Sequence, residues 1–149
     1  MMHRALFSIF AIFSATCLAE EMMPSVADFY GRWTVTDVVG YADMGGGIPH
    51  AKYLLGKVMV ITADGINFDH DACKAHNSFR VRMLDTASDL RENAGASPED
   101  AELPPKVALL DSEHCPQIYW LNPKKIEFDD MGVFVRAVRD TKPRPAVRR

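Results

Sequence analysis

Long hydrophobic segments and an excess of positive charge are both missing from this sequence. The apolar run from Ala5 to Phe13 is shorter than the roughly 18 residues that a membrane-spanning helix needs. Lysine and arginine number 17 against 20 aspartates and glutamates, for a net charge of −3. A chain of this charge is poorly suited to nucleic acid or to an anionic membrane surface as its main partner.

Sequence motifs of two enzyme classes are also missing. No Gly-x-Ser-x-Gly sequence is present to expose a nucleophilic serine. The glycine run from Gly45 to Gly47 lacks the lysine and the serine or threonine of a phosphate-binding loop, and a flexible loop is the simpler interpretation. We therefore expect a non-catalytic protein, with no catalytic residue and no cofactor.

The first residues do have a recognisable organisation. Arg4 precedes the apolar run, and the small-residue stretch from Ser14 to Ala19 follows it. This order is typical of a secretory signal peptide, so residues 1–19 are expected to be removed and the chain to be periplasmic, with no stable membrane anchor. Lipidation of Cys17 is an alternative, although the residues before it do not resemble a bacterial lipobox.

Cysteine is scarce, with three in the whole chain. Two of them, Cys73 and Cys115, remain after the expected cleavage, and an even count in an exported chain favours a disulfide. In the chain-entropy description this bond would contribute about 3 to 4 kcal/mol of stability. It would also remove both thiols from the candidate nucleophiles.

The rest of the chain is expected to be all-β. Short runs rich in β-branched and aromatic residues alternate with turn residues, which favours an antiparallel up-and-down barrel of about eight short strands. The expected strands are 32–39, 57–62, 66–69, 78–83, 106–110, 117–121, 126–128 and 133–139. Asp64-Gly65 predicts a tight hairpin turn. One or two helical turns are expected, within residues 51–55, ended by Gly56, and within 86–91.

We expect a single domain. Residues 20–30 form a lead-in, residues 31–139 the barrel, and residues 140–149 a basic flexible tail. The connections 41–56 and 84–105 are too long for simple hairpins, and connections of this length are often functional.

Three features together resemble the lipocalin-like, or calycin, barrels. They are Gly31-x-Trp33 on the first expected strand, the eight-strand meander, and an arginine near a phenylalanine on the last strand. The resemblance implies that Trp33 closes one end of the barrel and that Arg136 or Arg139 packs over its indole. A cation–π contact of that kind is worth roughly 0.5 to 2 kcal/mol.

A second resemblance covers most of the chain. Its residues are Gly31-x-Trp33, Leu55-Gly56-Lys57, the two later cysteines and Asp130-x-Gly132-x-Phe134. In this order they resemble uncharacterised small periplasmic proteins of Gram-negative bacteria. That resemblance implies a compartment and a fold, but no activity.

Four side chains are candidates for binding a ligand. Arg80 and Arg82, two residues apart on one strand, share a face. Turned inward they would bind an anionic group, and turned outward they would be solvated. Tyr53, within the first long connection, and Trp120 complete the predicted set.

Histidines and carboxylates gather near both of the later cysteines. If these cysteines are bridged, His76 and His114 would lie close together, with Asp69 or Asp71 nearby. Their spacing matches no standard zinc pattern. Polar loop residues around a disulfide are therefore the expected interpretation, and no metal is expected.

Two functions follow as hypotheses. The first is a periplasmic protein that holds a small apolar or amphipathic ligand inside the barrel, with the connection 41–56 as a lid. A narrow barrel can instead be filled by its own side chains, here Phe68, Phe79, Leu109 and Phe128. The second is an inhibitor or immunity protein that blocks a cell-wall hydrolase or a toxin by inserting a loop, because rigid scaffolds present loops at low ordering cost.

Overall fold

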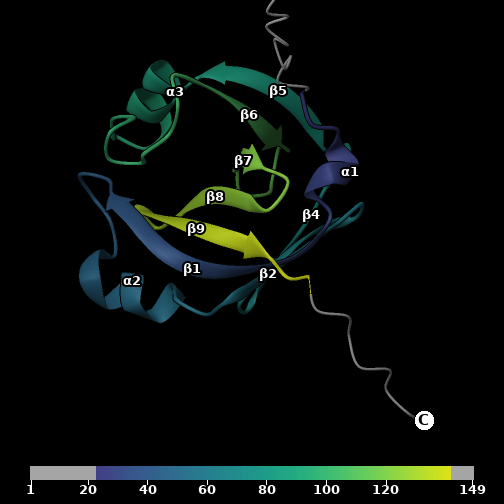
Figure 1. The fold of residues 1–149 in the computed structure, drawn as a ribbon, viewed down its shortest axis with the longest axis horizontal. Helices are drawn as coiled ribbons and strands as arrows, with labels where there is room; N and C mark the ends of the chain where they lie inside the picture. Colours follow the sequence, from purple (N-terminus) through teal and green to yellow (C-terminus); the bar gives the residue numbers. More distant parts are fainter. Residues whose placement is uncertain (1–22, 142–149) are drawn as a thin grey trace, which may run out of the picture.

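The structure, a computed structural model, describes residues 23–141. The expected signal peptide, residues 1–19, and most of the expected tail lie outside them. Within the described residues, one antiparallel sheet and short helices form a curled half-barrel (Figure 1). No helix in this part of the chain is long and apolar enough to cross a membrane. The predicted all-β, up-and-down fold is confirmed in this form.

The sheet has nine strands in the order β4-β3-β2-β1-β9-β8-β7-β6-β5. The strands are β1 (Gly31–Tyr41), β2 (Val58–Thr62), β3 (Gly65–Phe68), β4 (Asp71–Lys74), β5 (Arg80–Asp85), β6 (Lys106–Asp111), β7 (Ile118–Asn122), β8 (Lys125–Asp130) and β9 (Val133–Arg139). The helices are α1 (Val26–Phe29), α2 (Gly47–Leu54) and α3 (Thr86–Asn93). The order is that of an up-and-down meander in which β9 returns to β1. Its seam lies between the two edge strands, β4 and β5.

Strand β1 lies next to the central strand, β9, and it is bent. It pairs with β2 along its first half and with β9 along most of its length. The β9 ladder shifts register twice, between Val35 and Asp37 and between Val38 and Gly40. Irregularities of this kind bend a strand and increase its twist, so they contribute to the curl of the sheet (Figure 1).

Strand β4 is the one that the sequence pattern did not reveal. It is short, polar and at the sheet edge, so its residues show no apolar alternation. Strand β5 begins two residues later than expected, because Ser78 adopts a positive φ of 66°, in the left-handed region. The predicted hairpin between β2 and β3 is confirmed, but Thr62 pairs with Gly65, so Ala63 and Asp64 form the turn and Gly65 begins β3.

Both predicted helical segments are present, and both are longer than expected. Helix α3 follows the N-cap Asp85, whose carboxylate accepts a hydrogen bond from the Ser88 N–H at 3.2 Å. Helix α2 begins at Gly47, within the run expected to be a flexible loop. The Gly46 N–H donates to the Met131 carbonyl at 2.8 Å, so the β8–β9 turn holds this run in place.

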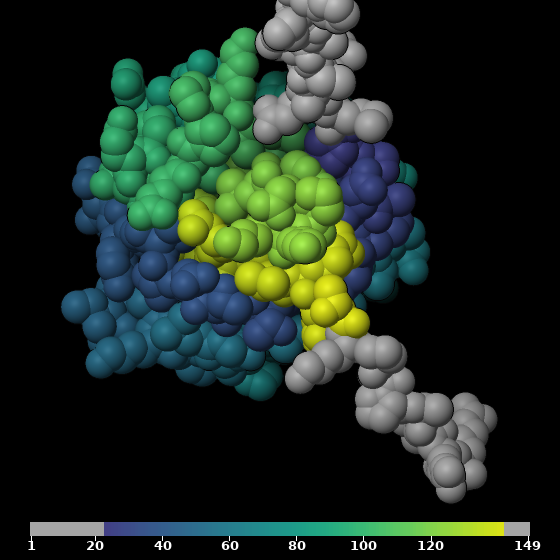
Figure 2. Space-filling view, viewed as in Figure 1, coloured from purple at the N-terminus to yellow at the C-terminus, as the bar shows by residue number. Residues whose placement is uncertain are grey.

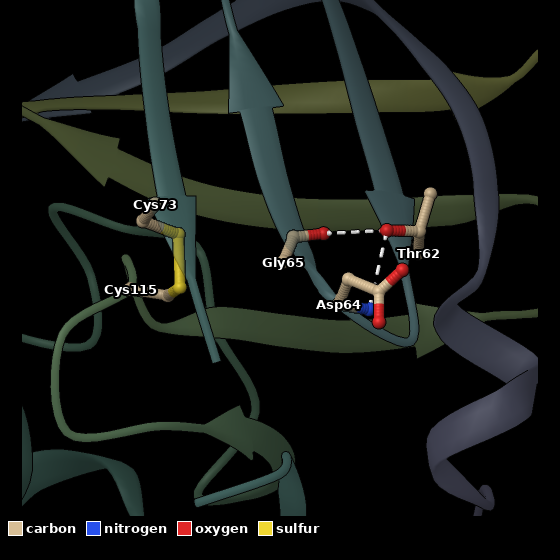
Figure 3. The surroundings of a disulfide bond; sticks show 5 residues. All are labelled: Thr62, Asp64, Gly65, Cys73 and Cys115. Carbon is tan, nitrogen blue, oxygen red and sulfur yellow. Dashed lines mark hydrogen bonds between the residues drawn. A yellow bond between two sulfur atoms is a disulfide. The ribbon is translucent and has the colours of Figure 1, made fainter. Parts of the chain in front are cut away.

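The predicted disulfide between Cys73 and Cys115 is confirmed, with the two Cα atoms 5.4 Å apart (Figure 3). Cys73 lies in the edge strand β4, and Cys115 lies in the connection between β6 and β7. The bond therefore links the two sides of the seam. Close by, the Thr62 hydroxyl donates to the Gly65 carbonyl and accepts from the Asp64 N–H, each at 3.3 Å (Figure 3). Disulfides are typical of proteins from oxidising compartments.

At one end of the half-barrel, Trp33 and Arg139 pack against each other. The guanidinium carbon lies 4.0 Å from the indole centroid, so Arg139 rather than Arg136 makes the contact that the resemblance implied. The same guanidinium donates hydrogen bonds to the backbone carbonyls of Asp28, Tyr30 and Pro123. The buried indole N–H donates to the Phe29 carbonyl at 2.8 Å. The pair therefore fastens α1 across this end of the sheet.

Gly31 has a specific reason to be glycine. Its φ is 136°, and a Cβ at this position would lie 2.9 Å from Nη1 of Arg139. Glycine therefore leaves room for the guanidinium that covers the tryptophan two residues later.

Candidate functional site

The concave side of the sheet is filled with side chains. Phe68 of β3 contacts Phe128 of β8 with ring centroids 5.0 Å apart, and because these strands are not neighbours the contact crosses the inside of the curl. Phe79 belongs to the same buried core, whereas Leu109 belongs to a second core on the opposite face. The space-filling view shows atoms of β7, β8 and β9 covering the middle of one face (Figure 2). The interior thus holds the protein's own side chains.

A hollow of about 590 Å³ opens at one end of the concave face, and we call it the Trp120 hollow. It lies between residues 23–28, the end of β5, the start of β6 and the end of β7. In the ladders Met83 is opposite Ala108, and Ala108 is opposite Trp120, so these three side chains point to the same face. They form the apolar wall of the hollow.

Trp120 is held from behind by other aromatic rings. Its centroid lies 4.9 Å from that of Phe29 and 6.4 Å from that of Trp33. Tyr119 packs in the second core instead, so the predicted alternation of these two neighbours is confirmed. The indole of Trp120 is thus part of a preformed wall.

Two charged side chains line the Trp120 hollow, Lys106 and Asp28. The backbone N–H of Ser25 donates to the Asp28 carboxylate at 2.7 Å, and the Ser25 hydroxyl donates at 2.8 Å. These hydrogen bonds hold the pKa of Asp28 below its ordinary value. Asp28 is therefore ionised and engaged by its own segment, and Lys106 supplies the cation at the site.

Arg80 and Arg82 lie on the face opposite to this hollow. They alternate along β5 with Met83, which lines it. Arg82 Nε donates to the Asp111 carboxylate at 3.2 Å, and its Nη2 lies 3.8 Å from Asp89. The structure therefore brings neither arginine to the Trp120 hollow.

Tyr53 lies on α2 and belongs to a different cluster. Its hydroxyl donates to Asp69, which also accepts from the Lys57 ammonium at 2.7 Å. The hydrogen bonds from Lys57 and then from Tyr53 lower the pKa of Asp69, and the bond to Asp69 raises the pKa of Lys57. These three side chains fasten α2 to the end of β3.

Arg136 pairs with a buried carboxylate rather than with Trp33. Its Nη2 lies 3.2 Å from Oε2 of Glu127, whose side chain is 0% exposed. The other carboxylate oxygen, Oε1, has no hydrogen-bond partner. Burial raises the pKa of Glu127 to about 7, because it outweighs the opposing effect of Arg136. Burial also raises the pKa of Tyr119, which is opposite Glu127 in the β7–β8 ladder.

His76 and His114 lie beside each other as predicted, with ring centroids 5.3 Å apart. Asp69 pairs with Lys57, and its carboxylate also lies 3.7 Å from His70. Across residues 23–141, no three side chains of histidine, cysteine, aspartate or glutamate gather in a way that would hold a metal ion.

Most of the residues that line the Trp120 hollow were not predicted from the sequence. Trp120 is the member of the predicted ligand-binding set that lines it. Met83, Lys106 and residues 23–28 lie outside that set, because they meet only when three strand ends and the lead-in come together. One signal was present, since Met83 is an apolar residue at the end of an alternating strand, and its side chain is half exposed.

Comparison with known proteins supplies no family for this chain. No protein-family model matches it, and comparison with curated proteins and with solved structures finds no match. The resemblance to lipocalin-like barrels is therefore supported in its coarser form, an antiparallel sheet curled into a half-barrel.

Proposed function

We propose that this chain is a non-catalytic periplasmic binding protein that holds a small apolar or amphipathic molecule in the Trp120 hollow. The supporting observation is the hollow itself, with a volume of about 590 Å³ and a wall of Met83, Ala108 and Trp120. A concave, largely apolar site with few polar groups is typical of small-molecule binding. Export rests on the predicted signal peptide, and the disulfide suits an oxidising compartment.

The proposed ligand position differs from the one expected from the sequence. Side chains fill the interior, so the ligand lies at the end of the half-barrel. Residues 23–28, rather than the connection 41–56, form the part of the chain that borders it. The apolar part of the ligand contacts Trp120 and Met83, and a polar or acidic group faces Lys106.

Replacing one wall residue is expected to weaken binding of an apolar probe. In Met83→Glu, a carboxylate replaces a half-exposed apolar side chain, and the dissociation constant of N-phenyl-1-naphthylamine should rise at least tenfold. Fully burying a methionine side chain contributes about 1.5 to 3 kcal/mol, so covering the exposed half of Met83 contributes roughly half of that. Desolvation of the introduced carboxylate brings the loss above the roughly 1.4 kcal/mol that corresponds to tenfold in affinity. Fluorescence titration of the probe measures the effect.

The matched control is Met44→Glu, the same substitution at a more exposed methionine that does not line the Trp120 hollow. It should leave probe binding within about twofold of the wild type. Equal weakening by both substitutions, or the absence of saturable binding to the wild-type chain, would contradict the proposal.

An inhibitor or immunity protein is the second candidate function, and one observation favours it. Met44 and Met131 are exposed on segments that backbone hydrogen bonds hold together. Exposed methionines on a rigid support suit protein contact, because the thioether side chain adapts to irregular surfaces. A hydrolase or toxin gene beside the coding sequence would favour this candidate over the first.

A further inference from the structure

A second surface lies where the connection between β1 and α2 meets the β8–β9 turn, and we call it the methionine tip. The two segments touch through glycines. A Cβ on Gly45 would come within 2.6 Å of the Met131 carbonyl oxygen, and a Cβ on Gly132 within 2.4 Å of the Met44 carbonyl oxygen. Larger residues at these two positions would push the segments apart. Close packing at Gly45 and Gly132 thus holds the segments that carry Met44 and Met131 next to each other.

Further contacts fix the tip to the sheet. The Ala42 N–H donates to the Gly132 carbonyl at 2.9 Å. Nε2 of His50 lies 2.7 Å from an Asp130 carboxylate oxygen, which joins α2 to the same turn. The tip therefore presents its side chains from a held backbone, and little backbone ordering is needed when a partner binds.

Apolar side chains are unusually exposed at the methionine tip. Met44 is 88% exposed and Met131 is 70% exposed. Ile48, near the start of α2, and Tyr41, the last residue of β1, are exposed as well. Exposed apolar side chains grouped on one surface mark contact sites more often than single ones do.

A hollow of about 500 Å³ adjoins the tip, and we call it the Asp129 hollow. Met44, Met131, Asn93 and Asp129 are among the residues that line it. The Asp129 carboxylate accepts a hydrogen bond from the Gly132 backbone, yet its Oδ1 is buried without any partner. A buried acceptor without a donor costs about 1 to 3 kcal/mol, so a donor that displaces the side chains covering Oδ1 would be favourable.

We propose that the Asp129 hollow receives a lysine or arginine side chain of a partner protein. Its two methionines accommodate the aliphatic stem, and the Asp129 carboxylate accepts hydrogen bonds from the charged head. Met44 and Met131 can adjust to the stem because an unbranched thioether side chain has three rotatable bonds.

Charge complementarity favours a basic side chain as the occupant of the Asp129 hollow. Among the described residues that line the Asp129 hollow, none is a lysine or an arginine. Asp43 adds an exposed carboxylate beside Met44. Asp130 is already engaged by His50, which leaves Asp129 as the acidic group inside the hollow. The site is separate from the Trp120 hollow, because the two share no lining residue.

The test uses the full mature chain with ¹³C-labelled methionine methyl groups. The probes are two capped pentapeptides that differ at one position, Gly-Ala-Lys-Ala-Gly and the same peptide with norleucine for lysine. The lysine peptide should shift the Met44 and Met131 signals with a dissociation constant at least tenfold lower than that of the norleucine peptide. Asp129→Asn should abolish this tenfold preference, whereas Asp71→Asn, at an exposed position on β4 outside the hollow, should change it by less than twofold.

Three results would overturn the inference. They are equal binding of the two peptides, no shift at millimolar concentrations, and shifts that appear only when the chain is shortened to end at Thr141. The last result would identify the chain's own basic segment, residues 142–149, as the occupant in place of a partner protein. None of these results bears on ligand binding at the Trp120 hollow, which Met83→Glu tests independently.

Discussion

Replacing both Cys73 and Cys115 with alanine is expected to lower the free energy of unfolding by about 3 to 4 kcal/mol. The bond closes a loop with a sequence separation of 42 residues, and in the chain-entropy description a loop of this length restricts the unfolded chain by about that amount. The loss is large against a total stability of about 5 to 15 kcal/mol for a domain. Urea denaturation of the mature chain, followed by tryptophan fluorescence, measures it.

The position of the bond gives a second reason for a large effect. Cys73 lies on β4, an edge strand that pairs with β3 among the described residues, and the disulfide ties this edge to the connection between β6 and β7. A reducing agent should destabilise the wild-type chain and leave the double variant unchanged, which provides the control. A loss below about 1 kcal/mol, or titratable thiols in the folded wild type, would show that the bond does not stabilise the seam.

Glu127→Gln is expected to make the protein less sensitive to pH between 4.5 and 7. The pKa of Glu127 is about 7 in the folded chain and near 4.5 in the unfolded chain. The folded state therefore binds the proton more tightly. The contribution of this proton binding to the free energy of unfolding is complete below pH 4.5 and is lost as the pH rises through 7. The two pKa values correspond to a loss of about 3 kcal/mol.

Comparison of the wild type with Glu127→Gln isolates the contribution of the Glu127 carboxyl to the pH dependence. Asp129 also has a raised pKa, through burial, and Asp28 and Asp69 have lowered ones, so other carboxyls contribute to the wild-type profile. The glutamine variant should match the wild type near pH 4 and exceed its stability by up to about 3 kcal/mol at pH 8. Chemical denaturation at a series of pH values measures the difference.

The pKa of Glu127 is raised because this carboxylate is buried and one of its oxygens is unpaired. Glu127 Oε1 has no donor, and Arg136 reaches only the other oxygen. Ionisation thus places a charge in the protein that one contact does not fully compensate. Glu92→Gln, at an exposed position on α3, is the control and should reproduce the wild-type profile. A glutamine variant less stable than the wild type at pH 8 would mean that the ion pair is net stabilising.

Features that depend on neighbouring residues could be predicted from the sequence. The β2–β3 hairpin, the alternation of Tyr119 and Trp120, and the first strand, expected at 32–39 and observed at Gly31–Tyr41, each follow from local sequence patterns. The disulfide followed from a count of two cysteines in a chain expected to be exported.

Features set by strand register could not be predicted in the same way. The alternation of Arg80 and Arg82 shows that they share a face, but a shift of one residue exchanges the two faces of a strand. Pairing with β6 places Met83 opposite Ala108, and this register assigns the arginines to the outer face. Strand β4 was missed for a related reason, because an edge strand made of polar residues has no buried face to reveal it.

Both hollows depend on contacts between distant segments. The Trp120 hollow needs the lead-in to lie across the ends of β6 and β7, and the methionine tip needs Gly45 to meet Gly132. Sequence patterns with a period of two or 3.6 residues report the faces of single elements. They carry no information on which ends of separate elements come together.

The methionine methyl groups allow the proposed binding site to be located directly. Met83 lines the Trp120 hollow, Met59 lies in the filled interior, and Met44 and Met131 mark the tip. When the ¹³C-methyl-labelled chain is titrated with N-phenyl-1-naphthylamine, ring-current shifts are expected at Met83, at Met23, which also lines the hollow, and at the Trp120 indole N–H. The Met44, Met59 and Met131 methyl signals should stay unchanged. Shifts at Met59 or at the tip without a shift at Met83, or no saturable shift at all, would contradict binding in the Trp120 hollow.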